Sequence, residues 1–253
     1  MPTDEIIIRL FLIVDERLGT IKKRADAKLY ASEIVTIGLL FALKGGRYRA
    51  FYRWLAANYA CWFPGLPELS RMHRLLEEHA ELTERFLAKP TLFTVLDTFG
   101  IELIHPRREG RSPQQIGTKG ISNGRWIVGV KLGWLVNDQG QVVDWDWDTA
   151  SAPDNVFRET AFRYEDQTIT LCDLGLRAAE EPQRNLKFCR RGEWNERFTV
   201  ETDFSWLTEV LHAKKMYHRV SAHLVARFRY MAALLNCLLH ITDGKRSLLQ
   251  FVI

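Results

Sequence analysis

The spacing of the apolar residues changes at Pro90. Before Pro90, apolar side chains recur at helical spacing, as Phe51, Trp54 and Leu55 do. After it, short apolar runs alternate with turn signals, and the first of these runs begins at Thr91. We therefore expect an α/β protein with two domains. Residues 1–89 would form a small helical domain, and residues 90–253 would form a second domain around a mixed sheet.

Within the first region the pattern predicts a succession of helices. Thr3 is a plausible N-cap for the first helix and Ser32 for the second, which Gly45 would end. A third helix would run from Tyr48 to Tyr59, before the prolines at 64 and 67, and a fourth from about residue 70 to residue 88.

The second region begins with a strand pattern at 91–97. A charged loop over 106–122 follows it, and two further strand patterns, at 125–136 and 141–148, flank a turn at 137–140. We expect this hairpin to pair with the 91–97 strand. The remaining predicted elements are a short helix at 155–163, strands at 168–173 and 186–189, and helices at about 175–182, 196–210 and 221–241.

Three acidic residues are the strongest functional signal. Asp97 and Asp173 each end an apolar run that reads as a buried strand, and Glu201 lies at the start of a long helical pattern. Carboxylates that converge on one point repel each other unless cations neutralise them, which suggests a pair of hard divalent metal ions. Two such ions can activate an attacking oxygen and stabilise a leaving oxygen in phosphoryl transfer.

Each of these residues also has a purely structural interpretation. A strand-end Asp can cap a helix, and Glu201 can form a solvated ion pair with Arg197, four residues before it on the same helical face. Trp194 can stack on a base or belong to the core. The alternating acids Asp144, Asp146 and Asp148 fit a solvated strand face better than a second metal site. No glycine-rich phosphate loop, GxSxG sequence or GxGxxG sequence occurs.

The overall charge and the cysteines narrow the class of protein. The net charge is +4, and basic residues outnumber acidic ones from Arg184 onward, which suits a polyanionic partner but also fits ordinary solvated helices. The four cysteines have neither zinc-ligand spacing nor the arrangement of a disulfide framework, as in a reducing cytoplasm. The acidic N-terminus is unlike a signal peptide. Residues 221–241 carry Arg227 and Arg229, so we expect a buried helix there and no membrane span.

Several segments together resemble the DDE transposases of bacterial insertion sequences. They are the helical opening at 47–55, the strand with Asp97, the segments 117–120 and 129–132, and Asp173-Leu174-Gly175-Leu176. The Arg197-to-Glu201 spacing is also similar to that in the family's Tyr-Arg-Glu-Lys signature. The resemblance covers most of the chain, and it implies that the helical domain at residues 1–89 helps to recognise the DNA ends of the element.

The resemblance implies a ribonuclease H-like catalytic domain, in which the first and fourth strands lie side by side and a later helix brings Glu201 to Asp97 and Asp173. These three residues would bind two Mg²⁺ ions, for which Mn²⁺ can substitute. The reaction would be hydrolysis at the ends of the element and then attack of the freed 3′-hydroxyl on target DNA. The partners would be double-stranded DNA and a second copy of the chain in a synaptic complex, in the cytoplasm of a bacterium at the nucleoid. Side chains expected to contact DNA are Trp194, Arg197, Lys119, Lys131, Lys214 and Lys215.

The sequence departs from the signature at several positions. Trp194 stands at the signature Tyr, Thr208 stands at the signature Lys, and Lys214 and Lys215 are the nearest substitutes. Leu176 replaces an aromatic residue, and the short interval between Asp173 and Glu201 leaves no room for a large insertion domain. Two alternatives therefore stay open: a nuclease of the same fold that does not join strands, and a non-catalytic DNA-binding regulator derived from a transposase.

Overall fold

The computed structural model describes residues 1–122, 124–178, 184–189, 197–244 and 248–251, and these form two compact units. The first unit comprises Met1–Phe86, Glu209–His212 and Val220–Ile253, and the second comprises Leu87–Thr208 and Ala213–Arg219. The chain thus leaves the helical unit close to the expected boundary at residue 89. It later returns, so the long C-terminal helix belongs to the helical unit.

The first unit is helical, as the sequence predicts. Its fourth predicted helix is interrupted at His79, after which the chain continues as a 3-10 helix. Two helix starts differ slightly from the expectation, because Pro2 precedes the first helix and Tyr30 the second. The elements are α1 (Thr3–Leu18), α2 (Ala31–Lys44), α3 (Tyr48–Tyr59), α4 (Leu69–Glu78), η1 (Ala80–Phe86), α7 (Ser221–Ile241) and η5 (Leu248–Phe251).

Helices α2 and α7 form the centre of this unit. They approach closely at Gly38, where a Cβ atom would collide with the ring of Tyr230. Tyr230 is fully buried, and its hydroxyl donates a hydrogen bond of 2.8 Å to the carbonyl of Leu76. The missing side chain at Gly38 therefore lets a large aromatic residue fill the space between the two helices.

Helix α7 is long and apolar enough to cross a membrane by length and composition alone. However, 78% of its most apolar 18-residue window is buried inside the structure, as in the core helix of a packed unit. The guanidinium of Arg227 lies within this helix and donates hydrogen bonds to the carbonyls of Phe41 and Ala42 at the end of α2. The expected buried helix at 221–241 is confirmed.

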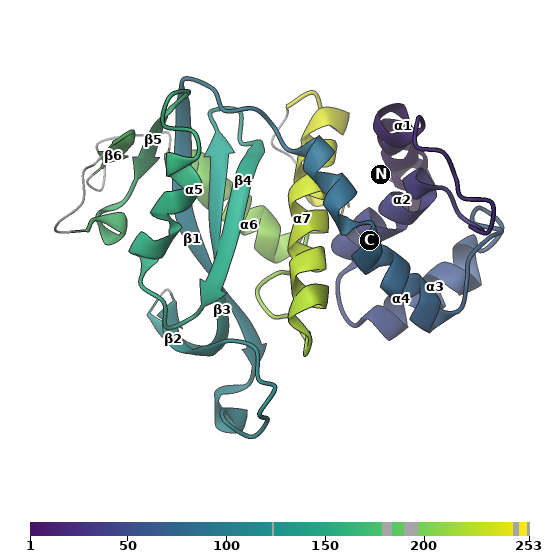
Figure 1. Ribbon diagram of the computed structural model, residues 1–253, viewed down its shortest axis with the longest axis horizontal. Helices are drawn as coiled ribbons and strands as arrows, with labels where there is room; N and C mark the ends of the chain where they lie inside the picture. Colours follow the sequence, from purple (N-terminus) through teal and green to yellow (C-terminus); the bar gives the residue numbers. More distant parts are fainter. Residues whose placement is uncertain (123, 179–183, 190–196, 245–247, 252–253) are drawn as a thin grey trace. The chain divides into compact units, whose positions relative to one another are not determined.

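The second unit contains a six-stranded mixed sheet (Figure 1). Strand β1 pairs antiparallel with β3 and parallel with β5, β3 pairs antiparallel with β2 and β4, and β5 pairs parallel with β6. The expected hairpin and its pairing with the first strand are therefore confirmed. The strands are β1 (Phe93–Ile104), β2 (Thr118–Ser122), β3 (Arg125–Asn137), β4 (Val142–Thr149), β5 (Ile169–Cys172) and β6 (Leu186–Phe188).

Helices cover both faces of β1, and successive residues of this strand contact helices on opposite faces. Leu96 belongs to an apolar cluster with Phe157 of η3 (Asp154–Phe157) and Phe162 of α5 (Arg158–Phe162). Phe99, which has the opposite parity on the strand, contacts the ring of Phe204 on α6 (Arg197–Glu209) at a centroid distance of 5.2 Å. Thus α5 and α6 lie on different faces of β1.

Three local expectations need correction. Strand β1 is longer than residues 91–97, and part of the predicted 106–122 loop forms β2, because Thr118–Ser122 pairs with the start of β3. The helix predicted at about 175–182 is only the 3-10 turn η4 (Leu174–Leu176) where the structure describes it, since Arg177 already has an extended backbone. Residues 179–183 lie outside the described part of the chain.

Candidate active site where strand β5 ends

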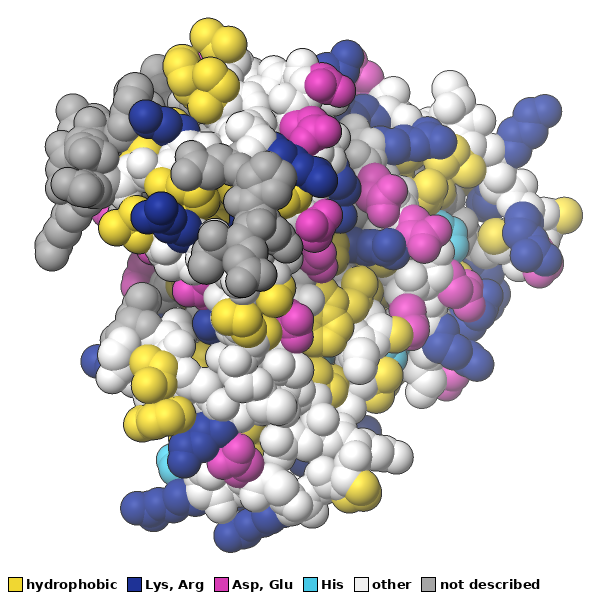
Figure 2. Space-filling view, turned by 60° about the vertical axis from the view of Figure 1, so that its left-hand side comes forward, with side chains coloured by type: hydrophobic (Ala, Val, Ile, Leu, Met, Phe, Trp, Pro, Cys, Tyr) yellow, Lys and Arg dark blue, Asp and Glu magenta, His cyan; other side chains and the backbone are white. Residues whose placement is uncertain are grey.

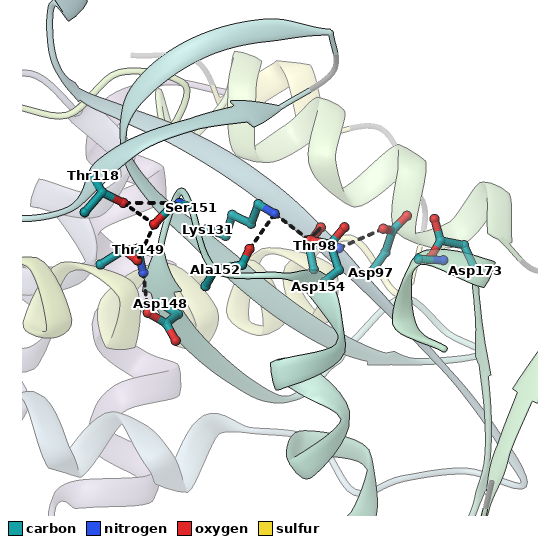
Figure 3. A network of polar contacts seen from close by, with 11 residues as sticks. Asp97, Thr98, Thr118, Lys131, Asp148, Thr149, Ser151, Ala152, Asp154 and Asp173 are labelled. Carbon is teal, nitrogen blue, oxygen red and sulfur yellow. Dashed lines mark hydrogen bonds and ion pairs between the residues drawn. The ribbon is translucent and has the colours of Figure 1, made fainter. Parts of the chain in front are cut away.

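Asp97 and Asp173 lie on neighbouring parallel strands. The last register pair between β1 and β5 is Leu96 with Cys172, and each aspartate is the next residue on its strand. Strand β5 ends there, whereas β1 continues to Ile104, so Asp173 leaves the sheet beside the middle of β1. Figure 3 shows the two carboxylates next to each other. Two oxygen-donor side chains, distant in sequence, therefore meet at one place.

Backbone amides help to orient both carboxylates. The amide of Thr98 donates a hydrogen bond of 2.7 Å to Oδ1 of Asp97, and the amide of Gly175 donates one of 2.9 Å to Oδ1 of Asp173. Asp173 is thus the N-cap of η4, as its structural interpretation predicted. Both residues are half-buried, so solvent or a ligand can still reach them.

A third aspartate, which we did not identify from the sequence, lies close to this pair. Oδ1 of Asp154 accepts hydrogen bonds from Nζ of Lys131 at 2.9 Å and from the hydroxyl of Thr98 at 3.2 Å. Its Oδ2 is 3.5 Å from where a Cβ atom on Gly175 would stand, which puts Asp154 beside the Asp173 turn. The only local signal for Asp154 is its position after Pro153 at a helix start, which is typical of a capping residue.

Lys131 is largely enclosed and has partners within the protein. Its side chain is 13% exposed, and Nζ donates to the carbonyl of Ala152 at 2.8 Å in addition to Asp154. We expected Lys131 to contact DNA, but in this structure its ammonium balances the charge of Asp154 (Figure 3). The Lys131–Asp154 ion pair therefore lies beside the carboxylates of Asp97 and Asp173 (Figure 3).

Glu201 lies on α6, the helix that covers the Asp97 face of β1. It is exposed and is one helical turn before Phe204, whose ring contacts Phe99. Phe99 is two residues beyond Asp97 and therefore on the same face of the strand. Helix α6, which carries Glu201, therefore packs on the face of β1 that carries Asp97, as expected. The structure also reveals a fully buried acid, Asp203, on the same helix.

The other expected DNA contacts are dispersed. Lys119 is exposed on β2, with Nζ 5.0 Å from the centre of the Trp126 ring. Lys214 is exposed, and Lys215 forms a 2.7 Å ion pair with Glu102, whose hydrogen bond raises the pKa of Lys215. Arg197 begins α6, but its side chain and the whole of Trp194 lie outside the described part of the chain.

The alternating acids of β4 have structural partners. Oδ2 of Asp144 forms a 2.9 Å ion pair with Nε of Arg163, and burial raises the pKa of Asp144 although Arg163 acts in the opposite direction. Oδ1 of each of Asp144, Asp146 and Asp148 accepts a hydrogen bond from the amide of the following residue. All three residues are half-buried, so the face that they share is less solvated than expected.

A shallow pocket lies at the opposite end of β5 from Asp173. Leu92, Ile169, Arg184 and Asn185 are among the residues that line it. It shares no residue with the aspartate pair, so we do not connect it with the candidate active site.

Carboxylate oxygens are the ligands that Mg²⁺ prefers, and Asp97, Asp173 and Asp154 supply this type of donor. Within the ranges that the structure describes, no three His, Cys, Asp or Glu side chains are grouped closely enough to hold a metal ion. Neither a protein-family model nor a curated protein matches this chain. Its function is therefore inferred from the residues themselves.

Proposed function

We propose that this protein is a DNA transposase of the DDE type, whose second unit has a ribonuclease H-like architecture. The observation that carries the proposal is the placement of Asp97 and Asp173 next to each other on parallel strands, one residue beyond the Leu96–Cys172 pair. This neighbourhood is expected for the first two acids of a DDE site. The contact between Phe204 of α6 and Phe99 supports Glu201 as the third.

The order of the strands also supports this architecture. The sheet contains the sequence β4-β3-β1-β5-β6, in which an antiparallel three-stranded meander is extended by two parallel strands on the side of β1. This is the arrangement that the resemblance implies, with β2 as an addition beside β3. The fold alone does not imply the function, so the carboxylates carry the chemical argument.

In the proposed reaction, Asp97, Asp173 and Glu201 would hold two Mg²⁺ ions at the scissile phosphate. When bound, such ions supply Lewis-acid stabilisation of the phosphoryl oxygens and activate the attacking oxygen. The protein's own part is to hold its carboxylates in place, through the amides of Thr98 and Gly175. An oxygen of water would bond to phosphorus while the bond to the 3′ oxygen breaks, which leaves a 3′-hydroxyl for attack on target DNA.

The test uses purified full-length protein and DNA that carries the inverted repeats flanking its coding sequence. Cleavage and joining are measured with Mg²⁺, with Mn²⁺ and with EDTA. We expect Asp97→Asn and Asp173→Asn to lower cleavage by at least about a hundred-fold, since even loss of a residue that only orients a metal ligand costs about 10–100-fold. Asp166→Asn is the matched control, because it makes the same charge change at an exposed position of the second unit.

The products decide between the proposal and its alternatives. Metal-dependent cleavage with strand joining, lost in both site variants and kept in the control, would support the transposase. Cleavage without joined products would instead indicate a nuclease of the same fold. Binding to the repeats without cleavage under any metal would refute the proposed reaction and favour a DNA-binding regulator.

A further inference from the structure

Strand β2 and the start of β3 form a two-stranded ribbon with one packed face and one outward face. Ser122 faces the sheet, because a Cβ atom on Gly100 would collide with its side chain. Gly120 likewise has no room for a side chain, since the carbonyl of Ala150 lies against it. By alternation, Ile121 and Lys119 point outward, and Ile121 pairs directly with Trp126 across the strands.

The outward face exposes an apolar pair with a cation over it. Ile121 is 53% exposed and Trp126 is 59% exposed. Nζ of Lys119 lies 5.0 Å from the centre of the Trp126 ring, within the range of a cation–π contact. Single exposed apolar residues are ordinary, but an exposed tryptophan paired with an exposed isoleucine and covered by a lysine is a more specific arrangement.

The neighbourhood of this ribbon is strongly basic. Arg125 is exposed at the start of β3, and η2 (Pro106–Arg108), which contacts β3, contributes exposed Arg107 and Arg108. Between residues 105 and 126 the acidic side chains comprise Glu109 alone, against five Lys and Arg. Figure 2 shows basic side chains gathered at the lower end of the view, where the chain after β1 extends in Figure 1. Such a surface attracts a polyanion.

We propose that Lys119, Ile121, Arg125 and Trp126, which we call the Trp126 surface, bind DNA by stacking an unpaired base on the indole ring. Aromatic rings among basic side chains are typical of surfaces that bind single strands, because every base can stack and every phosphate can meet a cation. The clustered positive charge favours this occupant over a protein partner. The inference rests on the proposed function and deepens it, by assigning to one surface the unpaired strand that end cleavage exposes.

The ribbon is tied to the candidate active site by hydrogen bonds. The hydroxyl of Thr118 on β2 is 2.6 Å from the hydroxyl of Ser151, and the next residue, Ala152, accepts from Lys131, which also binds Asp154 (Figure 3). Along β3, Trp126 is eight residues before Trp134, the register partner of Asp97. At about 3.3 Å per residue, this length of strand separates Trp126 from Trp134 by up to about 26 Å. The Trp126 surface is therefore a binding surface outside the reacting atoms.

The test is fluorescence anisotropy with a labelled single-stranded oligonucleotide and the same sequence as a blunt duplex, both in EDTA. We expect Trp126→Ala to weaken single-strand binding by at least about five-fold, the loss of one stacked base, and to affect the duplex less. Trp126→Phe keeps a stacking face and should recover most of the affinity. Trp62→Ala is the matched control, because Trp62 is also exposed, at 39%, but lies in the helical unit.

A second variant tests whether the positive charge of the Trp126 surface contacts phosphate. Lys119→Gln should reduce the salt dependence of single-strand binding, with the slope of log affinity against log salt smaller by about 0.7 for each lost phosphate contact. Lys22→Gln makes the same change at an exposed position of the helical unit and should leave the slope as it is.

Several results would overturn this assignment. They are single-strand affinity of Trp126→Ala within two-fold of wild type, equal losses for Trp126→Ala and Trp62→Ala, or equal losses on single strand and duplex. Circular dichroism checks that each variant is folded. Since EDTA prevents metal-dependent cleavage, the outcome is separate from the proposed reaction. A protein that binds single strands through Trp126 but never cleaves would refute the transposase and leave the Trp126 surface in place.

Discussion

The helical unit and the sheet unit each hold a cation against backbone carbonyls, but in different surroundings. In the helical unit, Arg227 is buried, donates to the carbonyls of Phe41 and Ala42, and lies 4.3 Å from the centre of the Phe41 ring. In the sheet unit, Lys131 donates to the carbonyl of Ala152 and to Asp154, whose side chain is 33% exposed.

The comparison shows that the charge of Arg227 has a structural role, whereas the charge of Lys131 lies beside the candidate active site. Arg227 donates to two carbonyl groups in the last turn of α2, where a helix has few backbone donors of its own. The carbonyl of Phe41 also accepts from the amide of Gly45, which follows the helix. The enclosure of Arg227 lowers its pKa to about 9, because burial disfavours the charged form, so it is still protonated at neutral pH. Lys131 instead balances one carboxylate beside two others, Asp97 and Asp173, at a half-buried position.

The largest expected effect is that of Arg227→Met. This change keeps an apolar side chain of similar length but removes the guanidinium donor of the Ala42 carbonyl, whereas the carbonyl of Phe41 keeps the amide of Gly45. We expect the free energy of unfolding to fall by about 1–3 kcal/mol, the cost of one buried unsatisfied acceptor. Urea denaturation followed by circular dichroism measures this loss.

Arg229→Met is the control for Arg227→Met on the same helix. Arg229 pairs with Glu81 and Glu84 at 3.4 and 3.5 Å, and both glutamates are well exposed. Such pairs contribute about 0–1 kcal/mol. Equal stability of the two variants would show that the free-energy cost of desolvating Arg227 offsets the gain from its hydrogen bonds. This result would contradict the structural role of Arg227 in the helical unit.

A smaller effect is expected for Lys131→Met in the sheet unit. Asp154 would keep the hydroxyl of Thr98 and its contact with solvent, so we expect a loss of about 1 kcal/mol or less. The double variant Lys131→Met/Asp154→Asn should be more stable than the sum of the two single effects predicts, because both changes remove the same ion pair. Additive losses in urea denaturation would show that the pair contributes nothing.

The pH dependence of stability gives the smallest effect at neutral pH. As the pH falls, His73 in the helical unit and Asp144 in the sheet unit change the stability in opposite directions. Burial, with a second contribution from the neighbouring His223, lowers the pKa of His73 from 6.5 to about 4. Below pH 6.5 the unfolded chain therefore binds a proton that the folded chain does not, so stability falls between pH 6.5 and pH 4. His73 stacks on Tyr48, and His223 faces Glu77 at 3.3 Å.

His73→Phe keeps a ring against Tyr48 and removes the titration, so its Tm should depend less on pH over that window. Asp144 of the sheet unit acts in the opposite direction, since its raised pKa makes protonation favour the folded state as the pH falls. Thermal unfolding of wild type, His73→Phe and Asp144→Asn at pH 7.5, 6 and 5 compares the two. An unchanged pH profile in His73→Phe would contradict the assignment for the helical unit.

Much of the local structure could be read from the sequence because the apolar spacing is unambiguous. The third helix, Tyr48–Tyr59, and the long helix Ser221–Ile241 have the predicted bounds. The hairpin around residues 137–140 also follows from the order of the patterns, and the parallel neighbour of β1 agrees with the strand order that the resemblance implies. Each of these features depends on residues close in sequence or on a simple rule of strand order.

The errors occurred where distant contacts override local pattern. Thr118–Ser122 is rich in polar residues and Gly, and it becomes a strand only because β3 is long enough to pair with it. The helix after Asp173 is a single 3-10 turn, Leu174–Leu176, although the sequence that begins at Leu174 suggested a longer helix. Local propensity is a weak guide when a neighbouring strand offers hydrogen bonds.

The sequence by itself determined the helical and sheet regions and the placement of Asp97 and Asp173 at the ends of buried apolar runs, because hydrophobic periodicity encodes which face of each element is buried. The adjacency of their two strands was implied by the resemblance to a family, and the pairing of β1 with β5 agrees with it. Only the tertiary structure decided that α7 packs with the helical unit, that Arg227 caps α2, and that Lys131 neutralises Asp154. These contacts join residues far apart in the chain. Their formation depends on which elements meet, and no local pattern of residues specifies that.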